Sequence, residues 1–233
     1  MVRSGNLKKI STHQFDKLME FTFRQSMDFV YDSRRHSIEF HSENASIAKV
    51  YLSIDQLWGK DNSLLKKSDF FLPVCVIKAG QASLALFHNS ELIDHKVFRA
   101  YMVRKKQGKS QVKHLKTKGK SRLGSRIRLS ETERFFEEIN KRLNKYNKHP
   151  IEKWALSCSK TLWPFLFESD VTPPFESKSE SIYKIPFHIS EAKFEIQDKL
   201  YHELCSMHIS TSEVGKKLLS PLLESSPQND EDW

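Results

Sequence analysis

The sequence lacks long apolar runs, paired cysteines and any Cys-x-x-Cys spacing. Its longest nearly apolar run, residues 70–77, is far shorter than the roughly 20 residues of a bilayer span, and no signal-like apolar region follows the basic start. Cys75, Cys158 and Cys205 are odd in number, widely spaced and set among apolar residues, which is typical of buried thiols in a reducing compartment. We therefore expect a cytoplasmic protein with no membrane partner, no structural zinc and no other metal.

Acidic residues are absent from one long segment. Between His95 and Ser130 there are thirteen Lys and Arg residues and no Asp or Glu. The whole chain has a net charge of +9, so the other 197 residues carry −4. Such a cluster repels itself, and a polyanionic partner, chiefly nucleic-acid phosphate, best explains it. A solvated basic loop without a partner is the alternative.

Apolar residues are sufficient for a core. Hydrophobic residues make up 38% of the 233 positions, and 16 of them are Phe. One core with appended arms fits this length. We expect a helical or irregular N-terminal extension over residues 1–60, a main domain over 61–210 and a flexible acidic tail over 211–233.

Three strands in succession begin the main domain. Apolar and alternating stretches at 70–80, 81–90 and 91–104 are separated by the turn residues Gly80 and Asn89-Ser90, which predicts an antiparallel meander. After the basic segment, Ser130 and Glu133 form a capping-box pattern that predicts the start of a helix. The apolar stripe of that helix is Phe135, Phe136, Ile139, Leu143 and Tyr146.

Strands and helices alternate after this point. The pattern predicts a strand at 153–158, a helical turn at 159–169, a strand at 181–187 and a helix at 189–209. This order favours an α/β fold, a ribonuclease-H-like layer sandwich with a mixed five-stranded sheet. A long basic loop would leave the sheet after its third strand, and loops of about 25 residues inside a domain are usually functional or disordered.

Gly108 and Gln111 lie inside this loop. Glycine lets the backbone adopt conformations closed to other residues and approach a ligand closely. The Gln111 amide has two donors and one acceptor without charge, so it can orient a water or hydroxyl nucleophile, or hydrogen-bond an oxygen on which charge develops. A Gly-x-x-Gln pattern alone is too common to indicate a function. Its position inside a basic loop without acidic residues is what makes it a candidate site.

A known family shares these residues. "LFHNSELIDHKVFRAYMVRKKQGKSQ", followed by "SRLGSRIR" and a helix, resembles the Vms-type release-factor (VLRF) family, which is related to the catalytic domain of eukaryotic and archaeal class-one release factors. The similarity runs from about residue 70 to 209. It implies a role in ribosome-associated quality control, in which the loop enters the peptidyl-transferase centre of a stalled large subunit. The nascent chain is then released by hydrolysis of peptidyl-tRNA or by cleavage of the tRNA near its CCA end.

The resemblance also implies partners. These are the large ribosomal subunit with peptidyl-tRNA, and ribosomal RNA. Release factors proper carry Gly-Gly-Gln, whereas here Lys109 and Ser110 separate Gly108 from Gln111. The zinc finger, the ankyrin repeats and the segment that binds an AAA ATPase in eukaryotic members are not found, so the sequence does not support an AAA ATPase partner.

These considerations assign the candidate site. Gln111 would correspond to the family's catalytic glutamine, with Gly108 shaping the loop around it, and no cofactor is expected. The residues expected to bind RNA are Arg99, Arg104, Lys105, Lys106, Lys109, Lys113, Lys116, Lys118, Lys120, Arg122, Arg126 and Arg128. A non-catalytic ribosome- or RNA-binding module is the alternative function, in which the same loop binds phosphates and Gln111 is dispensable.

Overall fold

The computed structural model describes residues 2–3, 7–43, 45–100 and 120–223, and for residues 2–3 and 120–129 the backbone alone. The chain divides into two compact units. The mixed-sheet unit comprises Met1–Val2, Ser68–Ile185 and Ile189–Tyr201, and the antiparallel unit comprises Arg3–Lys67, Pro186–His188 and His202–Trp233. Each unit has its own sheet and its own apolar core.

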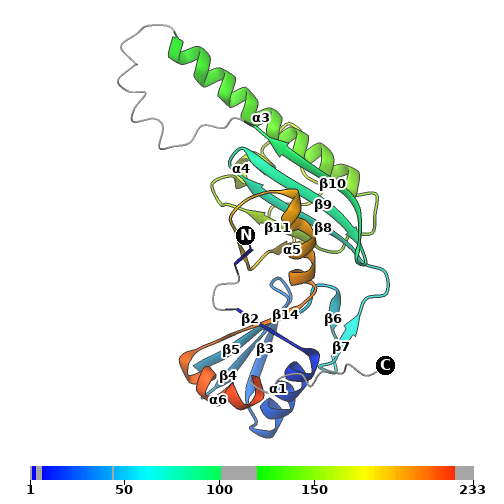
Figure 1. Cartoon of the computed structure of the whole chain (residues 1–233), viewed down its shortest axis with the longest axis vertical. Helices are drawn as coiled ribbons and strands as arrows, with labels where there is room; N and C mark the ends of the chain where they lie inside the picture. The colour runs from blue at the N-terminus through cyan, green and yellow to red at the C-terminus, as the bar shows by residue number, and fades with distance from the viewer. Residues whose placement is uncertain (1, 4–6, 44, 101–119, 224–233) are drawn as a thin grey trace. The chain divides into compact units, whose positions relative to one another are not determined.

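A mixed five-stranded sheet forms the first unit (Figure 1). Its strands, in sheet order, are β10 (Glu91–Arg99), β9 (Gln81–His88), β8 (Phe71–Lys78), β11 (Trp154–Cys158) and β12 (Ile182–Lys184). Strand β9 is antiparallel to both β8 and β10, while β11 is parallel to β8 and to β12. The predicted mixed sheet is confirmed. Because β9 alone runs in the opposite direction, the C-terminal ends of the other four strands, β8, β10, β11 and β12, lie at the same edge of the sheet, named here the carboxyl edge.

The turns of the meander explain its register. Gly80 and Asn89 have φ values of 75° and 49°, the left-handed region that tight turns require and that Gly and Asn tolerate best. The Asn89 side chain also accepts a hydrogen bond from the backbone N–H of Phe70 at 3.1 Å. The Ala100 N–H donates to the Gly80 carbonyl at 2.9 Å, so the end of β10 lies against the β8–β9 turn.

Helix α3 (Lys120–Tyr146) lies along one face of this sheet (Figure 1). Its predicted stripe is buried against strand residues such as Ile77, Leu84 and Leu86, together with α4 (Trp163–Phe167). The helix begins at Lys120, ten residues before the predicted cap at Ser130. The prediction was wrong because the apolar period, on which it depended, starts only at Phe135.

The opposite face carries a shorter layer. Here η3 (Phe194–Ile196) and α5 (Gln197–Leu204) cover the sheet. The buried Gln197 amide donates to the Ser83 hydroxyl at 2.8 Å, and the Tyr201 ring stacks on Phe87 with centroids 4.4 Å apart. The sheet is thus covered on both faces, which parallel strands require.

The antiparallel unit has a second five-stranded sheet. Its strands, in sheet order, are β2 (Lys8–Ile10), β14 (Met207–Thr211), β5 (Ala45–Tyr51), β4 (Ser37–Ser42) and β3 (Asp28–Asp32). Two helices, α1 (Thr12–Arg24) and α6 (Glu213–Leu223), bury their apolar sides in the core of this unit. The remaining strands are β6 (Gln56–Trp58), which pairs with β7 (Leu64–Lys66), and the short β1 (Val2–Arg3) and β13 (His188–Ile189).

Both ends of the chain differ from the sequence-based expectation. In the N-terminal extension, expected to be helical or irregular, Asp28–Asp32, Ser37–Ser42 and Ala45–Tyr51 form three paired strands, and Glu213–Leu223, expected to be tail, form a helix. The helix predicted over 189–209 covers only Gln197–Leu204, after the 3-10 turn η3, and β14 follows as an inner strand between β2 and β5. Pairing partners over 150 positions away stabilise this strand, which local periodicity does not reveal. Residues 224–233 lie outside the described ranges.

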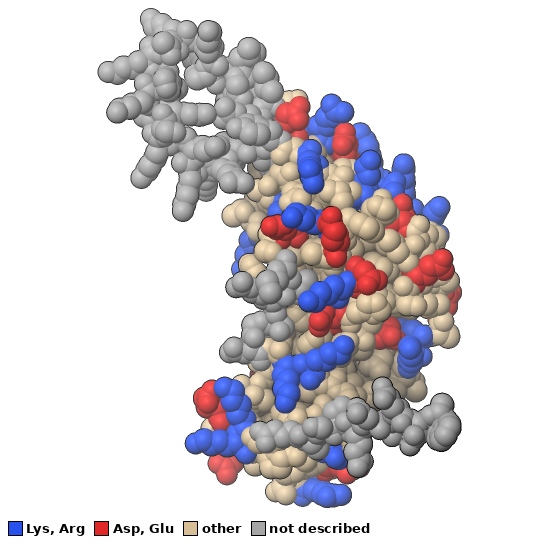
Figure 2. Space-filling model, viewed as in Figure 1, with Lys and Arg blue, Asp and Glu red and all other residues tan. Residues whose placement is uncertain are grey.

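Charge is mixed over the described surface. Figure 2 shows basic and acidic side chains interspersed on the face that it draws. None of the helices in the described part of the chain has the length and apolarity that a bilayer crossing needs. Within the same ranges, no group of three or more His, Cys, Asp or Glu side chains is placed to hold a metal ion.

Gly215 gives a test of the antiparallel unit. A Cβ added there would lie 1.9 Å from the Ile47 carbonyl oxygen of β5, so α6 can approach the sheet only with glycine at this position. Ala is favoured over Gly by about 1 kcal/mol in an open helix. Here we expect Gly215→Ala to lower the free energy of unfolding by about 2 kcal/mol or more instead.

Chemical denaturation followed by circular dichroism measures this change. The control is Lys217→Ala on the exposed side of the same helix, which should alter stability by less than about 0.5 kcal/mol. A Gly215→Ala variant as stable as the control would contradict the close packing of α6 on β5.

Candidate functional site

The predicted site residues fall into three groups. Arg99 is fully described and ends β10 at the carboxyl edge. The backbone positions of Lys120, Arg122, Arg126 and Arg128 lie in the first turns of α3, on a helix rather than in the predicted loop. The others lie outside the described residues: Arg104, Lys105, Lys106, Gly108, Lys109, Gln111, Lys113, Lys116 and Lys118.

The segment 101–119 therefore connects two described anchors. Before it, the Ala100 N–H bonds to the Gly80 carbonyl at the carboxyl edge. After it, α3 begins at Lys120. The strand and the helix thus fix the residues that flank the segment on either side. The last ten residues of the predicted loop, 120–129, instead belong to α3.

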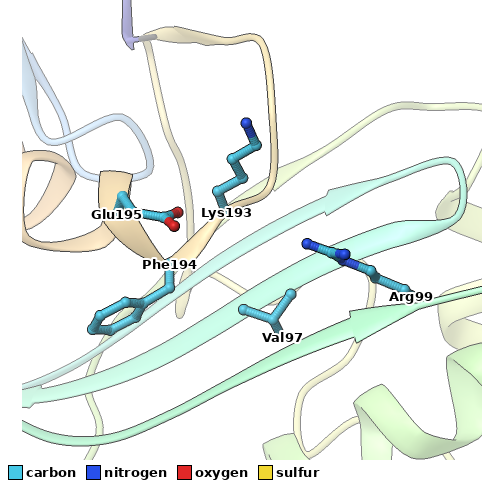
Figure 3. A pocket seen from close by; sticks show the side chains of 5 residues that line it. All are labelled: Val97, Arg99, Lys193, Phe194 and Glu195. Carbon is cyan, nitrogen blue, oxygen red and sulfur yellow. The ribbon is translucent and has the colours of Figure 1, made fainter.

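Arg99 lines an open pocket of about 580 Å³. Figure 3 shows Val97 and Arg99 on the strand side of this pocket, with Lys193, Phe194 and Glu195 on the segment opposite. Alternation along β10 places Val97 and Arg99 on the sheet face away from α3, since Phe98 between them belongs to the core under that helix. The pocket thus lies beside the point where the segment 101–119 begins.

Lys193 is a partly compensated cation in this pocket. Its Nζ pairs with Glu191 at 2.5 Å, and this hydrogen bond raises the pKa of Lys193 while it lowers the pKa of Glu191. The positive charge of Arg99 acts in the opposite direction on the pKa of Lys193. Among the described residues Arg99 has no ion pair of its own. The pocket therefore offers Arg99 as a cation without an ion pair among these residues, alongside the Glu195 carboxylate that also lines it.

Phe194 adds an aromatic surface. The residue is 40% exposed, and the His95 ring packs against its ring with centroids 4.1 Å apart and the ring planes tilted by 30°. An aromatic ring beside an exposed guanidinium can hold a base and its phosphate, as RNA-binding surfaces do. His95 thus has a structural partner in this arrangement.

Two polar contacts hold α3 in place. The buried Asn140 amide donates to the carbonyl oxygens of Leu166 and Val171, at 2.8 and 2.6 Å. Two residues later, Arg142 pairs with Asp94 of β10. These contacts link the helix both to the α4 region and to the strand that precedes the segment 101–119. They therefore fix the helix that carries four of the predicted basic residues.

Sequence reasoning missed Lys193 and Phe194. They lie more than ninety positions from Arg99 along the chain, and no local motif marks them. Only the packing of η3 on the sheet face brings them to β10. A basic residue beside an exposed aromatic is too common a pair to identify such a site from sequence.

Comparisons with known proteins identify a family and solved structures that are similar to this chain. The family model described as Bacteroidetes VLRF1 release factor matches residues 72–212. A solved structure titled "Vms1 mitochondrial localization core" is similar at 14% identity and a TM-score of 0.39, and the alignment covers 88% of this chain and 91% of that one. No curated protein matches the sequence.

Asn140 gives a test of how α3 is held. Asn140→Ala removes the donor to two carbonyl oxygens in the core region, and we expect a loss of about 2 kcal/mol in unfolding free energy. The matched control is Asn144→Ala, whose amide makes similar bonds to Asn140 and Thr172 but in an exposed position. Denaturation curves should show a loss below about 0.5 kcal/mol for the control. Equal losses in the two variants would refute the anchoring role of Asn140.

Proposed function

Because the chain belongs to the Bacteroidetes VLRF1 release-factor family, we propose that it releases stalled nascent chains from peptidyl-tRNA on the large ribosomal subunit. The family establishes a release-factor type of function associated with the ribosome. The proposal adds the chemistry, which is hydrolysis of the peptidyl-tRNA ester or cleavage of the tRNA near its CCA end. It also adds a cytoplasmic location, with ribosomal RNA and peptidyl-tRNA as the partners.

One observation carries the proposal. The family match covers residues 72–212, a range that includes β9, β10, α3 and the Gly108-Lys109-Ser110-Gln111 sequence in the segment between the two anchors. Family membership thereby supports a functional role for this segment. Its residues are suited to binding phosphate, since Lys and Arg are frequent and acids are absent.

The proposed catalytic group is the Gln111 amide. An uncharged amide is too weak a base to remove a proton efficiently, so its role is to position a water or a hydroxyl and to stabilise developing charge by hydrogen bonding. Gly108 would let the backbone near it approach the tRNA closely. The basic residues of the segment and of the first turns of α3 would neutralise RNA phosphates around it.

The mixed-sheet unit is the proposed catalytic domain, corresponding to most of the predicted range 61–210. We further propose that its layers are ribonuclease-H-like. The sheet order β10-β9-β8-β11-β12 with β9 alone antiparallel, and helices on both faces, support this assignment.

Substitution of Gln111 tests the catalytic role. We expect Gln111→Ala to lower the rate of release from stalled large subunits by about a hundredfold or more, because removing one hydrogen bond to a developing charge typically lowers the rate by this factor. Binding to the subunit should change little, because the loss falls on the transition state. The measurement is release of a labelled nascent peptide, with gel analysis of the tRNA 3′ end to separate ester hydrolysis from CCA removal.

The control for this experiment is Gln107→Ala, which removes a neighbouring glutamine outside the Gly-x-x-Gln pattern. It should retain release. Full activity of Gln111→Ala would instead support the non-catalytic RNA-binding module. In that case charge reversal of several lysines in the segment 104–118 would still abolish function.

Arg99 tests the RNA-binding role of the carboxyl edge. Arg99→Gln removes one phosphate contact, so it should weaken binding to the large subunit and reduce the slope of log affinity against log salt by about 1. Lys148→Gln, an exposed lysine after the C-terminal end of α3, makes the same charge change and should leave the slope as it is. If the two variants show the same salt dependence, Arg99 does not contact RNA phosphate.

A further inference from the structure

The topology of the mixed sheet creates a crevice at its carboxyl edge. Strands β8 and β11 are parallel neighbours. The strand that follows β8 in the chain, β9, lies on one side of this pair, whereas the strand that follows β11, β12, lies on the other side. In open α/β sheets, ligands bind outside the carboxyl ends of the strands where the strand order reverses. A ligand site is therefore expected near the ends of β8 and β11.

A cavity of about 420 Å³ lies beside this place, at the ends of β11 and its parallel neighbour β12. It is lined by residues from the ends of β11 and β12 and from the segment leading into α4. Those that matter here are Ser157, Cys158, Lys160, Trp163 and Lys184. Its volume is in the range of pockets that hold small ligands or single nucleotides. It shares no lining residue with the pocket of Arg99.

The charge of this cavity is positive. Lys160 and Lys184 are both exposed, and no carboxylate is among the lining residues. Neither lysine has an ion pair within the described ranges. Burial raises the pKa of the Cys158 thiol to about 12, although the nearby charge of Lys78 partly opposes this, so the thiol adds no negative charge at neutral pH. An anionic group is the complementary ligand.

Trp163 provides an aromatic surface beside these charges. Its side chain is half-buried, and the Lys184 ammonium lies 5.6 Å from its ring centre. Phe167 packs against the same ring, with centroids 4.9 Å apart, and limits its movement. A fixed aromatic ring beside lysines is how proteins bind single-stranded nucleic acid, since the base stacks while the cations bind its backbone.

We propose that this cavity, named the Trp163 pocket, binds a nucleotide of single-stranded RNA, with its base against Trp163 and its phosphate between Lys160 and Lys184. The inference rests on the proposed function, which brings the chain to ribosomal RNA and tRNA. An RNA duplex fits less well, because its bases are stacked inside the helix and unavailable to the ring. A purely apolar ligand would leave two lysines at the cavity without a counter-charge.

Binding of a labelled single-stranded oligoribonucleotide of about ten nucleotides to the full chain tests the proposal. Fluorescence anisotropy gives the dissociation constant at several salt concentrations. Trp163→Leu should raise Kd about fivefold to a hundredfold, the loss associated with one stacked base. The pair Lys160→Gln and Lys184→Gln should raise Kd and reduce the salt slope by about 1.

The matched control is the pair Lys145→Gln and Lys148→Gln, which makes the same charge change at exposed positions near the end of α3. A lysine pair indistinguishable from this control overturns the proposal, as does an unchanged Kd for Trp163→Leu. Because Trp163 contacts the core, its variant is first checked for a native thermal midpoint, and the lysine pair decides if that check fails.

Competitors identify the ligand. Unlabelled single-stranded RNA should displace the probe, whereas a duplex of the same sequence or inorganic phosphate at equal phosphate concentration should not. Displacement by phosphate alone would show a simple anion site and overturn the assignment to RNA. The release assay of Gln111→Ala is a separate experiment, so a negative result for the Trp163 pocket does not contradict the proposed catalytic role of Gln111. Conversely, if Gln111→Ala releases the nascent chain fully while the Trp163 and lysine variants bind RNA more weakly, the catalytic role is refuted and the pocket is supported.

Discussion

The packing of α3 on the mixed sheet is the constraint on which the rest of this structure depends. Phe136, Ile139 and Leu143 are fully buried against one face of the sheet. The hydrogen bonds of Asn140 and the ion pair of Arg142 also fix the orientation of the helix on that face. Because β10 and α3 are both fixed in one core, the segment 101–119 leaves and rejoins the protein at defined places. A basic segment with fixed ends loses less entropy on binding than one joined to free arms.

The carboxyl edge of the mixed sheet places several basic residues on the same side of the unit. Since β9 alone runs against the other strands, the ends of β8, β10, β11 and β12 come together, and with them Arg99, Lys78, Lys160 and Lys184. Arg99 belongs to the basic segment that the sequence indicates, whereas no local motif marks Lys78, Lys160 or Lys184. The topology, rather than any single element, gathers cations on the edge from which the segment 101–119 departs. Lys193 and the aromatic rings of Phe194 and Trp163 extend the same chemistry around that edge.

Local patterns predicted the parts of the fold that depend on local chemistry. Gly80 and Asn89 marked the meander, and the stripe from Phe135 to Tyr146 marked α3. The start of α3 was missed because the positions that continue its stripe toward Lys120, such as Arg128 and Ser125, are polar. The second sheet and the inner strand β14 were missed because distant pairing decides them. For the site, the sequence indicated Gln111 and its basic surroundings, which lie outside the described residues. It gave no sign of Lys193 or Trp163, whose roles depend on tertiary neighbours.

The central claim is that the two anchors deliver Gln111 to the junction of the nascent chain or the CCA end with its tRNA. A structure of the full chain on a large ribosomal subunit carrying peptidyl-tRNA tests this most directly. The account predicts that the segment 101–119 reaches the peptidyl-transferase centre, with the Gln111 amide at the tRNA 3′ end and the carboxyl edge facing RNA. A complex in which Gln111 instead contacts the protein's own surface, or in which the edge faces solvent, would contradict it.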